Sequence, residues 1–299
     1  MAPTNPENFL RQIKDPAFLR KCVVFIGAGL SIPPGKRWDK LVREIATKCV
    51  VEVQSKTNKQ IIDDCLLKPD AYKKAFRELF PKYQAACRTA LPYILHIEFK
   101  AYITTNFGPY LRNLASSRDI NRVHVYPDLP LNHGLSKAIY YIHGCYDSED
   151  PNSDPEQLIF GFQSFEDGYG SPSLLPGFLL SLFTYENILF LGFDPLEEKI
   201  RAILEESIEV RKSVWQTNSK HGNTGPKRYV LWPSPLIDNA GERAKLESTI
   251  EEFKALDLDP ITYDPIYEDY SGLEKLLHEI IAQEEFVNRP PPFTSGFDL

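Results

Sequence analysis

The sequence predicts an α/β protein: a doubly wound parallel sheet of about six strands, flanked by helices. Short apolar runs that end in glycine or a polar residue recur along the chain, and such runs are typical of parallel strands buried on both faces. Segments with helical spacing separate these runs, which is the order expected for a doubly wound sheet. At 299 residues and 42% hydrophobic composition, the chain can also bury a sizeable core.

The six expected strands are short, and the residues that follow four of them are informative. The strands are Cys22–Ile26, Ala101–Thr105, Ala138–Ile142, Asn187–Leu191, Arg228–Trp232 and Pro260–Tyr263. The first is followed by Gly27, the second by Asn106, the third by His143 and the fourth by Gly192. Open parallel sheets bind ligands at the carboxyl ends of their strands, so these positions are the first candidates for a site.

Helices are expected between the strands. They cover part of the first 20 residues, 38–53, much of 54–98 with boundaries at Pro69, Pro81 and Pro92, and then 196–210, 242–256 and 273–286. Two segments are interpreted as additions to the sheet, a helical insert at about 54–98 and a lid loop at about 146–176. Aromatic residues of the expected loops, such as Phe162, Phe165 and Tyr169, are candidates to cover a pocket or to form an oligomer interface.

Charge and cysteine content exclude several classes of protein. The formal net charge of −7 disfavours a surface dedicated to nucleic acid or to anionic membranes. No apolar run approaches the roughly 18 residues of a membrane span, and no secretory signal is expected. The five cysteines are widely spaced without a CxxC pair, which excludes a zinc ribbon and favours a reducing, cytoplasmic location.

The turn after the first strand, Gly27-Ala28-Gly29-Leu30-Ser31, is a candidate phosphate site. Glycines let the backbone turn tightly and approach a pyrophosphate, whose charge is then held by backbone N–H groups. Ile32 replaces the third glycine of the GxGxxG fingerprint, and the following region is interpreted as helix, so a hydride-transfer site is poorly supported. The alternative is a tight glycine turn without a ligand.

Asn106 and His143 are the candidate catalytic residues. An imidazole is the usual general acid or base near neutral pH, and an asparagine at a strand end offers an acceptor and two donors to a sugar hydroxyl or a water. The alternative for His143 is a hydrogen-bonded structural histidine. The other five histidines are assigned to helices or polar loops and lack metal-site spacing, so no metal is predicted.

Four motifs in order resemble the sirtuin superfamily, and more closely its zinc-free bacterial branch of antiphage-defence domains. They are Ile26–Ser31, Thr104–Phe107, Ile142–Gly144 and Leu191–Asp194, and the similarity spans about residues 20–235. We therefore expect a sirtuin-like Rossmann domain over residues 1–287, and the proline content of the last residues predicts a Pro-rich tail at 288–299.

The resemblance also implies that NAD is the substrate and that its bond to nicotinamide is cleaved. Asn106 would orient the nicotinamide ribose or the attacking water, and His143 would be the general base. The phosphates and the adjoining ribose would be held by Gly27, Ala28, Gly29 and Ser31, with Thr105 also in the binding set, and the adenosine end would be lined by Gly192, Phe193 and Asp194.

Two departures from the family matter for the reaction. Sirtuin deacylases carry four zinc-binding cysteines after the histidine, whereas only Cys145 follows it here, which favours hydrolysis of NAD over protein deacylation. The family usually has an aspartate that contacts the nicotinamide carboxamide two residues after the asparagine, and this chain has Gly108.

The resemblance, with these departures, implies an NAD glycohydrolase that serves as the effector of a bacterial antiphage system through NAD depletion. Such an activity must be gated, by homo-oligomeric assembly or by a partner such as a HerA-type ring ATPase, an Argonaute-like guide protein or another phage-sensing module; direct binding of nucleic acid or membrane is not expected. A nucleotide-binding regulatory or structural subunit with a weakened site, favoured by Gly108, and an ADP-ribosyl transferase are the alternatives.

Overall fold

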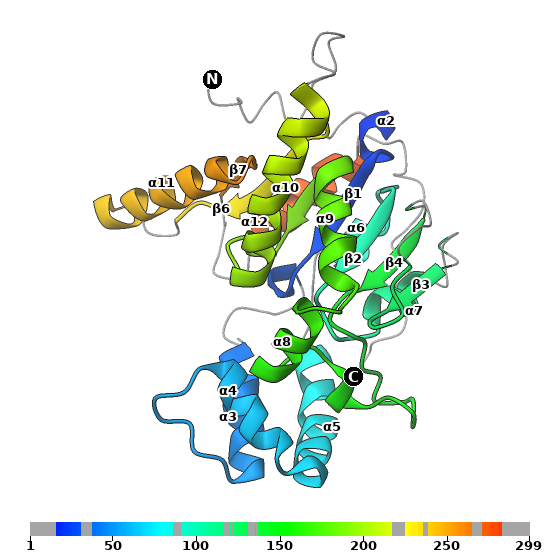
Figure 1. Ribbon diagram of the computed structural model, residues 1–299, viewed down its shortest axis with the longest axis vertical. Coiled ribbons are helices and arrows are strands. Elements are labelled where there is room, and N and C mark those ends of the chain that lie inside the picture. Colours follow the sequence, from blue (N-terminus) through cyan, green and yellow to red (C-terminus); the bar gives the residue numbers. More distant parts are fainter. Residues whose placement is uncertain are drawn as a thin grey trace.

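The computed structural model describes residues 16–30, 38–85, 91–115, 120, 122–130, 135, 137–216, 225–235, 239–264 and 271–282. Within these ranges the protein has one seven-stranded sheet in the order β3-β4-β2-β1-β5-β6-β7, and all its pairings are parallel (Figure 1). The chain builds outward from β1 to one edge, then returns to β5 on the other side of β1. The predicted doubly wound sheet is confirmed, with one strand more than expected.

The strands are β1 (Cys22–Ile26), β2 (Ala101–Thr104), β3 (Arg122–Val125), β4 (Ala138–Tyr141), β5 (Asn187–Leu191), β6 (Arg228–Pro233) and β7 (Asp259–Tyr263). Strand β3 was not predicted, because it lies at the sheet edge, begins with exposed Arg122 and has no fully buried position. His124 therefore belongs to a strand rather than to a helix or loop, and its ring stacks on Tyr140 at 4.9 Å.

Helices cover both faces of the sheet, as its alternating side chains require. Val24 and Ile26 of β1 belong to one apolar cluster, whereas Val23 and Phe25 belong to the other. The first cluster is completed by α2 (Pro16–Leu19), α6 (Leu91–Ile94), α7 (Tyr110–Ala115) and α12 (Ser271–Ala282). The second is completed by α9 (Leu175–Tyr185), α10 (Glu198–Gln216) and α11 (Ala240–Ala255).

A third apolar cluster holds a helical block below the carboxyl ends of the strands (Figure 1). We call α3 (Trp38–Cys49), α4 (Asn58–Leu66) and α5 (Pro69–Ala85) the helical block. Phe107, Tyr146 and Leu158, from loops that follow the sheet strands, are buried in the same cluster. Helix α3 thus packs with α4 and α5, whereas α6 packs against the sheet.

Two local predictions were wrong. Pro81 lies inside α5 instead of ending a helix; the stacked rings of Phe76 and Phe80, at 4.8 Å, are buried in the third cluster and hold this turn, so tertiary packing offsets the missing backbone donor. The segment expected to be a lid loop contains a short 3-10 turn (Pro155–Gln157) and a helix, α8 (Phe162–Tyr169).

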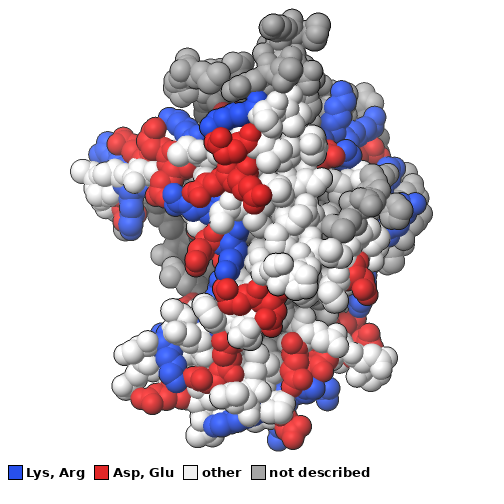
Figure 2. All heavy atoms as spheres, in the orientation of Figure 1, with Lys and Arg blue, Asp and Glu red and all other residues white. Residues whose placement is uncertain are grey.

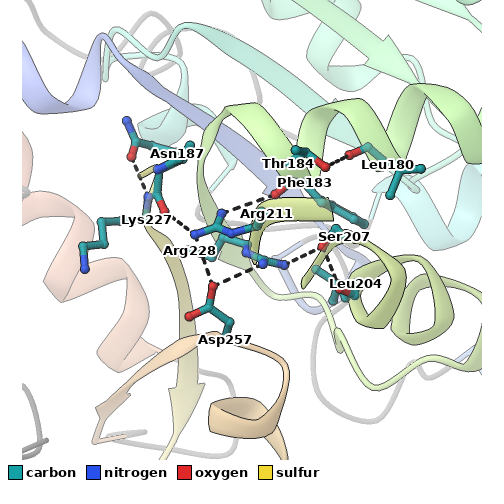
Figure 3. A network of polar contacts seen from close by, with 11 residues as sticks. Leu180, Phe183, Thr184, Asn187, Leu204, Ser207, Arg211, Lys227, Arg228 and Asp257 are labelled. Atoms are coloured by element: carbon teal, nitrogen blue, oxygen red, sulfur yellow. Dashed lines mark hydrogen bonds and ion pairs between the residues drawn. The ribbon is translucent and has the colours of Figure 1, made fainter. Parts of the chain in front are cut away.

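A buried arginine joins α10, β6 and the turn after α11 at the amino end of β6 (Figure 3). The Arg228 side chain is completely buried; its Nη1 lies 3.0 Å from Ser207 Oγ and its Nη2 lies 3.3 Å from Asp257 Oδ2. Arg211 reaches the same carboxylate at 3.1 Å. Burial, with Arg211 nearby, lowers the Arg228 pKa to about 10, and Nε of Arg228 has no hydrogen-bond partner in the described part of the chain.

Acidic and basic side chains are interspersed over α10 and α11 (Figure 2). Arg201 of α10 pairs with Glu252 of α11 at 2.9 Å and with Glu205 of its own helix at 3.0 Å. The charge pattern there is that of a solvated, internally paired surface. Among the described helices, none combines the length and the apolar character that a membrane crossing requires.

Candidate functional site

The carboxyl ends of four neighbouring strands lie at one level of the sheet. The pairing places in one row, from β5 through β1 and β2 to β4, the residues Leu191, Ile26, Thr104 and Tyr141. Two positions beyond this row, in the same order, come Phe193, Ala28, Asn106 and His143. Since neighbouring strands lie about 4.8 Å apart, the row is about 14 Å long. The topology therefore brings the ends of all four sequence motifs to one edge, at the strand-order reversal where α/β sheets bind ligands.

The glycines of the first motif allow two loops to approach each other closely. Gly27 N donates to Leu191 O at 3.0 Å, and Gly29 N donates to Gly192 O at 2.8 Å. A Cβ on Gly27 would lie 2.3 Å from Gly192 O, and one on Gly29 would lie 2.8 Å from the same oxygen. These glycines thus have a packing role in addition to the phosphate contact predicted for them, and the Gly29 N–H already has an acceptor. Ser31 lies outside the described residues.

The loop after β5 contains Gly192, Phe193 and Asp194. Gly192 has φ +58°, a left-handed conformation that favours glycine. Phe193 packs on Phe25 with ring centroids 4.7 Å apart, so part of its surface belongs to the core. Asp194 is exposed, and its Oδ1 accepts the Leu196 N–H at 3.0 Å, which orders the turn before α10. Their contact with adenosine stays a prediction.

Asn106 is held by hydrogen bonds beside the glycine loop. It is buried; its Nδ2 donates to Gly27 O at 3.2 Å, and its backbone N–H donates to Thr104 Oγ1 at 3.0 Å. Thr104 Oγ1 in turn donates to Ile26 O at 3.1 Å, and the Thr105 N–H donates to the same carbonyl at 3.2 Å. The end of β2 is therefore fastened to β1, and the amide of Asn106 has a fixed position.

His143 is buried at the end of β4, with 8% of its surface exposed. Its Nε2 lies 2.7 Å from Tyr169 Oη, and the rings of His143 and Phe165 form a T-shaped contact with centroids 5.2 Å apart. Burial, and to a smaller extent the charge of Lys59, lowers the His143 pKa to about 3. The imidazole is therefore neutral at physiological pH, the form in which one ring nitrogen accepts a proton.

Helix α8 covers the histidine with aromatic side chains. Phe165 and Tyr169, both proposed from the sequence as pocket covers, lie against His143 with their own rings parallel. Sequence reasoning missed Lys59, whose Nζ lies 3.5 Å from the Phe165 ring centroid and 3.0 Å from Glu197 Oε1. The i, i+3, i+7 spacing of Phe162, Phe165 and Tyr169 was the signal that predicts a helix here.

Neither a metal nor a reactive thiol is indicated near these residues. In the ranges that the structure describes, no three His, Cys, Asp or Glu side chains are grouped so that they could hold a metal ion. Burial raises the Cys145 pKa to about 11, so this thiol is protonated and a poor nucleophile at neutral pH. Gly108, where the resembling family has an aspartate, is half-buried between β2 and α7.

A comparison with protein families finds one match. The profile of the SIR2-like domain family matches residues 100–261, which is more than half of the chain. The matched range begins at β2, ends within β7 and contains Asn106, His143 and Gly192. A search of curated proteins finds no relative. The chain therefore belongs to the SIR2-like domain family, and an NAD-related enzyme is the class of protein that this membership supports.

Proposed function

We propose that the protein is an NAD glycohydrolase, which converts NAD and water into nicotinamide and ADP-ribose. The observation that carries the proposal is that Asn106 and His143 each lie two residues beyond the paired ends, Thr104 and Tyr141, of the neighbouring strands β2 and β4, within a SIR2-like domain. A buried, hydrogen-bonded amide and a neutral imidazole beyond the carboxyl ends of β2 and β4 supply the polar groups that the reaction uses.

Hydrolysis of NAD depends more on positioning the ribose and the water than on strongly activating the water. The bond between ribose C1′ and the pyridinium nitrogen breaks with its electron pair moving to that nitrogen, so nicotinamide leaves as a neutral molecule. The water oxygen bonds to C1′, and the proton that the water loses is accepted by neutral His143. Asn106, fixed beside the glycine loop, orients the ribose hydroxyls or the water. Placement of this kind lowers the barrier by aligning the reactants in advance.

The biological role that we propose is that of a defence effector in the bacterial cytoplasm. The order of the four strand-end motifs resembles that of antiphage domains, and depletion of NAD would stop phage growth together with the growth of the host cell. Unregulated turnover would be lethal, so the activity is gated by self-assembly or by a partner such as a HerA-type ring ATPase. Turnover at full rate by the isolated chain at every concentration would contradict this gating.

An etheno-NAD assay with chromatographic separation of the products tests the activity. Asn106→Ala and His143→Ala are each expected to lower kcat at least about 100-fold. His124→Ala and Asn187→Ala are matched controls, because His124 lies in the edge strand β3 and stacks on Tyr140, and Asn187 Oδ1 accepts the Lys227 N–H at the amino end of β5. Full activity of the His143 variant would refute the assigned role.

A nucleotide-binding regulatory subunit is the second candidate, and Gly108 favours it, since a glycine offers no side chain to the nicotinamide carboxamide. Calorimetric binding of NAD without any turnover across a series of protein concentrations would support this alternative. Turnover that depends on an added acceptor would instead indicate an ADP-ribosyl transferase.

A further inference from the structure

Helix α8 is fastened to the helical block at its amino end. The Gln163 N–H donates to Asp63 Oδ2 at 3.2 Å, so a carboxylate of α4 caps α8. Gly161, the residue before the helix, lies so close that an added Cβ would be 2.2 Å from Asp63 Oδ1. The contact with Asp63 of α4 therefore fixes the position of the first turn of α8.

The middle of α8 is fastened on two sides. Lys59 of α4 lies over the Phe165 ring and also binds Glu197, just before α10. Lys199 of α10 pairs with Glu166 at 2.6 Å. A cation over an aromatic face and two ion pairs between elements restrict the movement of the helix, so the position of its last residue, Tyr169, is set by α4 and α10 together.

Tyr169 meets His143 at the other end of α8. The hydroxyl lies 2.7 Å from Nε2, within hydrogen-bond distance. Burial raises the Tyr169 pKa well above its ordinary value, so the hydroxyl keeps its proton and needs an acceptor. With the tyrosine hydroxyl as the donor, the lone pair of Nε2 is that acceptor and the imidazole proton lies on Nδ1. Tyr169 is half-buried, whereas His143 is buried.

We infer that Tyr169 is a catalytic proton relay between the substrate side of the site and His143. The inference rests on the proposed function. A proton leaves the attacking water, or the ribose hydroxyl, and bonds to Tyr169 Oη; the original hydroxyl proton moves at the same time from Oη to His143 Nε2. Tyrosine stays neutral throughout, and the imidazole becomes an imidazolium, which returns the proton to solvent after product release. A histidine whose Nε2 is already occupied can in this way still act as the base.

The first test compares Tyr169→Phe with wild type and with Tyr185→Phe, a control at the exposed end of α9. The relay predicts a loss of at least about 100-fold in kcat for Tyr169→Phe, with a KM for etheno-NAD within about twofold and a melting temperature lowered only by the loss of one hydrogen bond. The control keeps wild-type kinetics. Unchanged or increased kcat in Tyr169→Phe would overturn the relay.

A second measurement separates proton transfer from a merely structural role. A fluorinated tyrosine at position 169, introduced by codon suppression, fills the same space but has a lower pKa. The relay predicts that the alkaline limb of the kcat profile moves to lower pH, since an ionised tyrosine has no proton to give to Nε2. An unmoved limb would overturn the relay.

The failures of the two proposals are distinguishable. If wild type cleaves etheno-NAD and His143→Ala does not, while Tyr169→Phe remains active, the relay alone is wrong. If wild type releases no nicotinamide at any protein concentration, the proposed function is wrong and the relay is wrong with it. If His143→Ala cleaves etheno-NAD as fast as wild type, the role of His143 and the relay are wrong, although the hydrolysis stands.

Discussion

Replacing Arg228 with methionine is expected to leave the protein as stable as before or more stable. The change removes a fully buried guanidinium whose Nε has no partner in the described structure and which shares one carboxylate with Arg211. Its neighbours keep other partners: Ser207 Oγ also donates to Leu204 O at 2.6 Å, and Asp257 retains Arg211 at 3.1 Å. The substitution therefore creates no new unpaired group.

The expected change in the free energy of unfolding follows from the desolvation cost of burying Arg228 and from the interactions that the buried guanidinium makes. A buried, unpaired N–H costs about 1–3 kcal/mol, and a buried charge costs several more. The opposing gain is limited, because the Asp257 side chain is 57% exposed and solvent screens its attraction to about 0–1 kcal/mol, while the bond to Ser207 contributes about 1.5–3 kcal/mol. Arg228→Met should thus change the free energy of unfolding by about 0 to +3 kcal/mol. Ser207→Ala, which leaves a second guanidinium nitrogen unpaired, should lower it by about 1–3 kcal/mol.

Urea unfolding followed by circular dichroism measures both changes. Arg228→Met should raise the urea midpoint or leave it unchanged, whereas Ser207→Ala should lower it. Both variants should keep the wild-type dependence of the unfolding free energy on urea concentration. A loss above about 1 kcal/mol in Arg228→Met at an unchanged slope would refute the reasoning, because the arginine would then stabilise the fold despite its burial.

Three further outcomes are expected. Gly27→Ala should lower the free energy of unfolding by about 1–3 kcal/mol and weaken NAD binding in a calorimetric titration, because the new Cβ would lie 2.3 Å from Gly192 O. Gly177→Ala, whose Cβ would meet open space, should change neither the binding nor the thermal unfolding; equal effects of the two variants would contradict this. Between pH 6.5 and the His143 pKa of about 3, the unfolded state binds more protons than the folded state. This residue therefore contributes stability that is present above pH 6.5 and is lost as the pH falls. In a series of urea unfolding curves, His143→Gln should reduce the slope of the free energy of unfolding against pH on the acid side by up to about 1.4 kcal/mol per pH unit. An identical slope in both proteins would count against a buried neutral histidine. Cys145, half-buried, should react slowly with a thiol reagent in the native protein, while the three buried cysteines of the described residues should react only on unfolding, as peptide mapping would show; faster labelling of a buried thiol would show that local opening exposes it.

The sequence predicted the sheet because its central strands are continuous apolar runs. Strand β1 is buried at all five positions and is recognisable without its neighbours. Strand β3 has no such run, since an edge strand needs to bury only one side. Helix α9 escaped prediction because it packs on the sheet beside α10 and is apolar on nearly all sides, which removes the periodic signal of a surface helix.

The sequence predicted the positions of the candidate site residues that directly follow the ends of strands. Asn106 and His143 follow buried runs directly, and parallel pairing places them at one level. Tyr169 was expected to cover a pocket, but its contact with His143, like the position of Lys59, depends on tertiary contacts between α8, α4 and the sheet, which no local pattern encodes. Gly27 was predicted to contact a phosphate, but its close approach to the loop after β5 became visible only in the structure.

The pairing of β1 with β5 also sets the time at which the site can form during synthesis. Ile26 pairs with Leu191, so the glycine loop lacks its neighbour until most of the chain has been translated. At roughly 5–20 residues per second, a ribosome needs about 8–33 s to pass from the first of these residues to the second. A nascent chain therefore carries the first motif for more than half of its synthesis without a complete row of strand ends, and the proposed hydrolase has no complete site before β5 has been made.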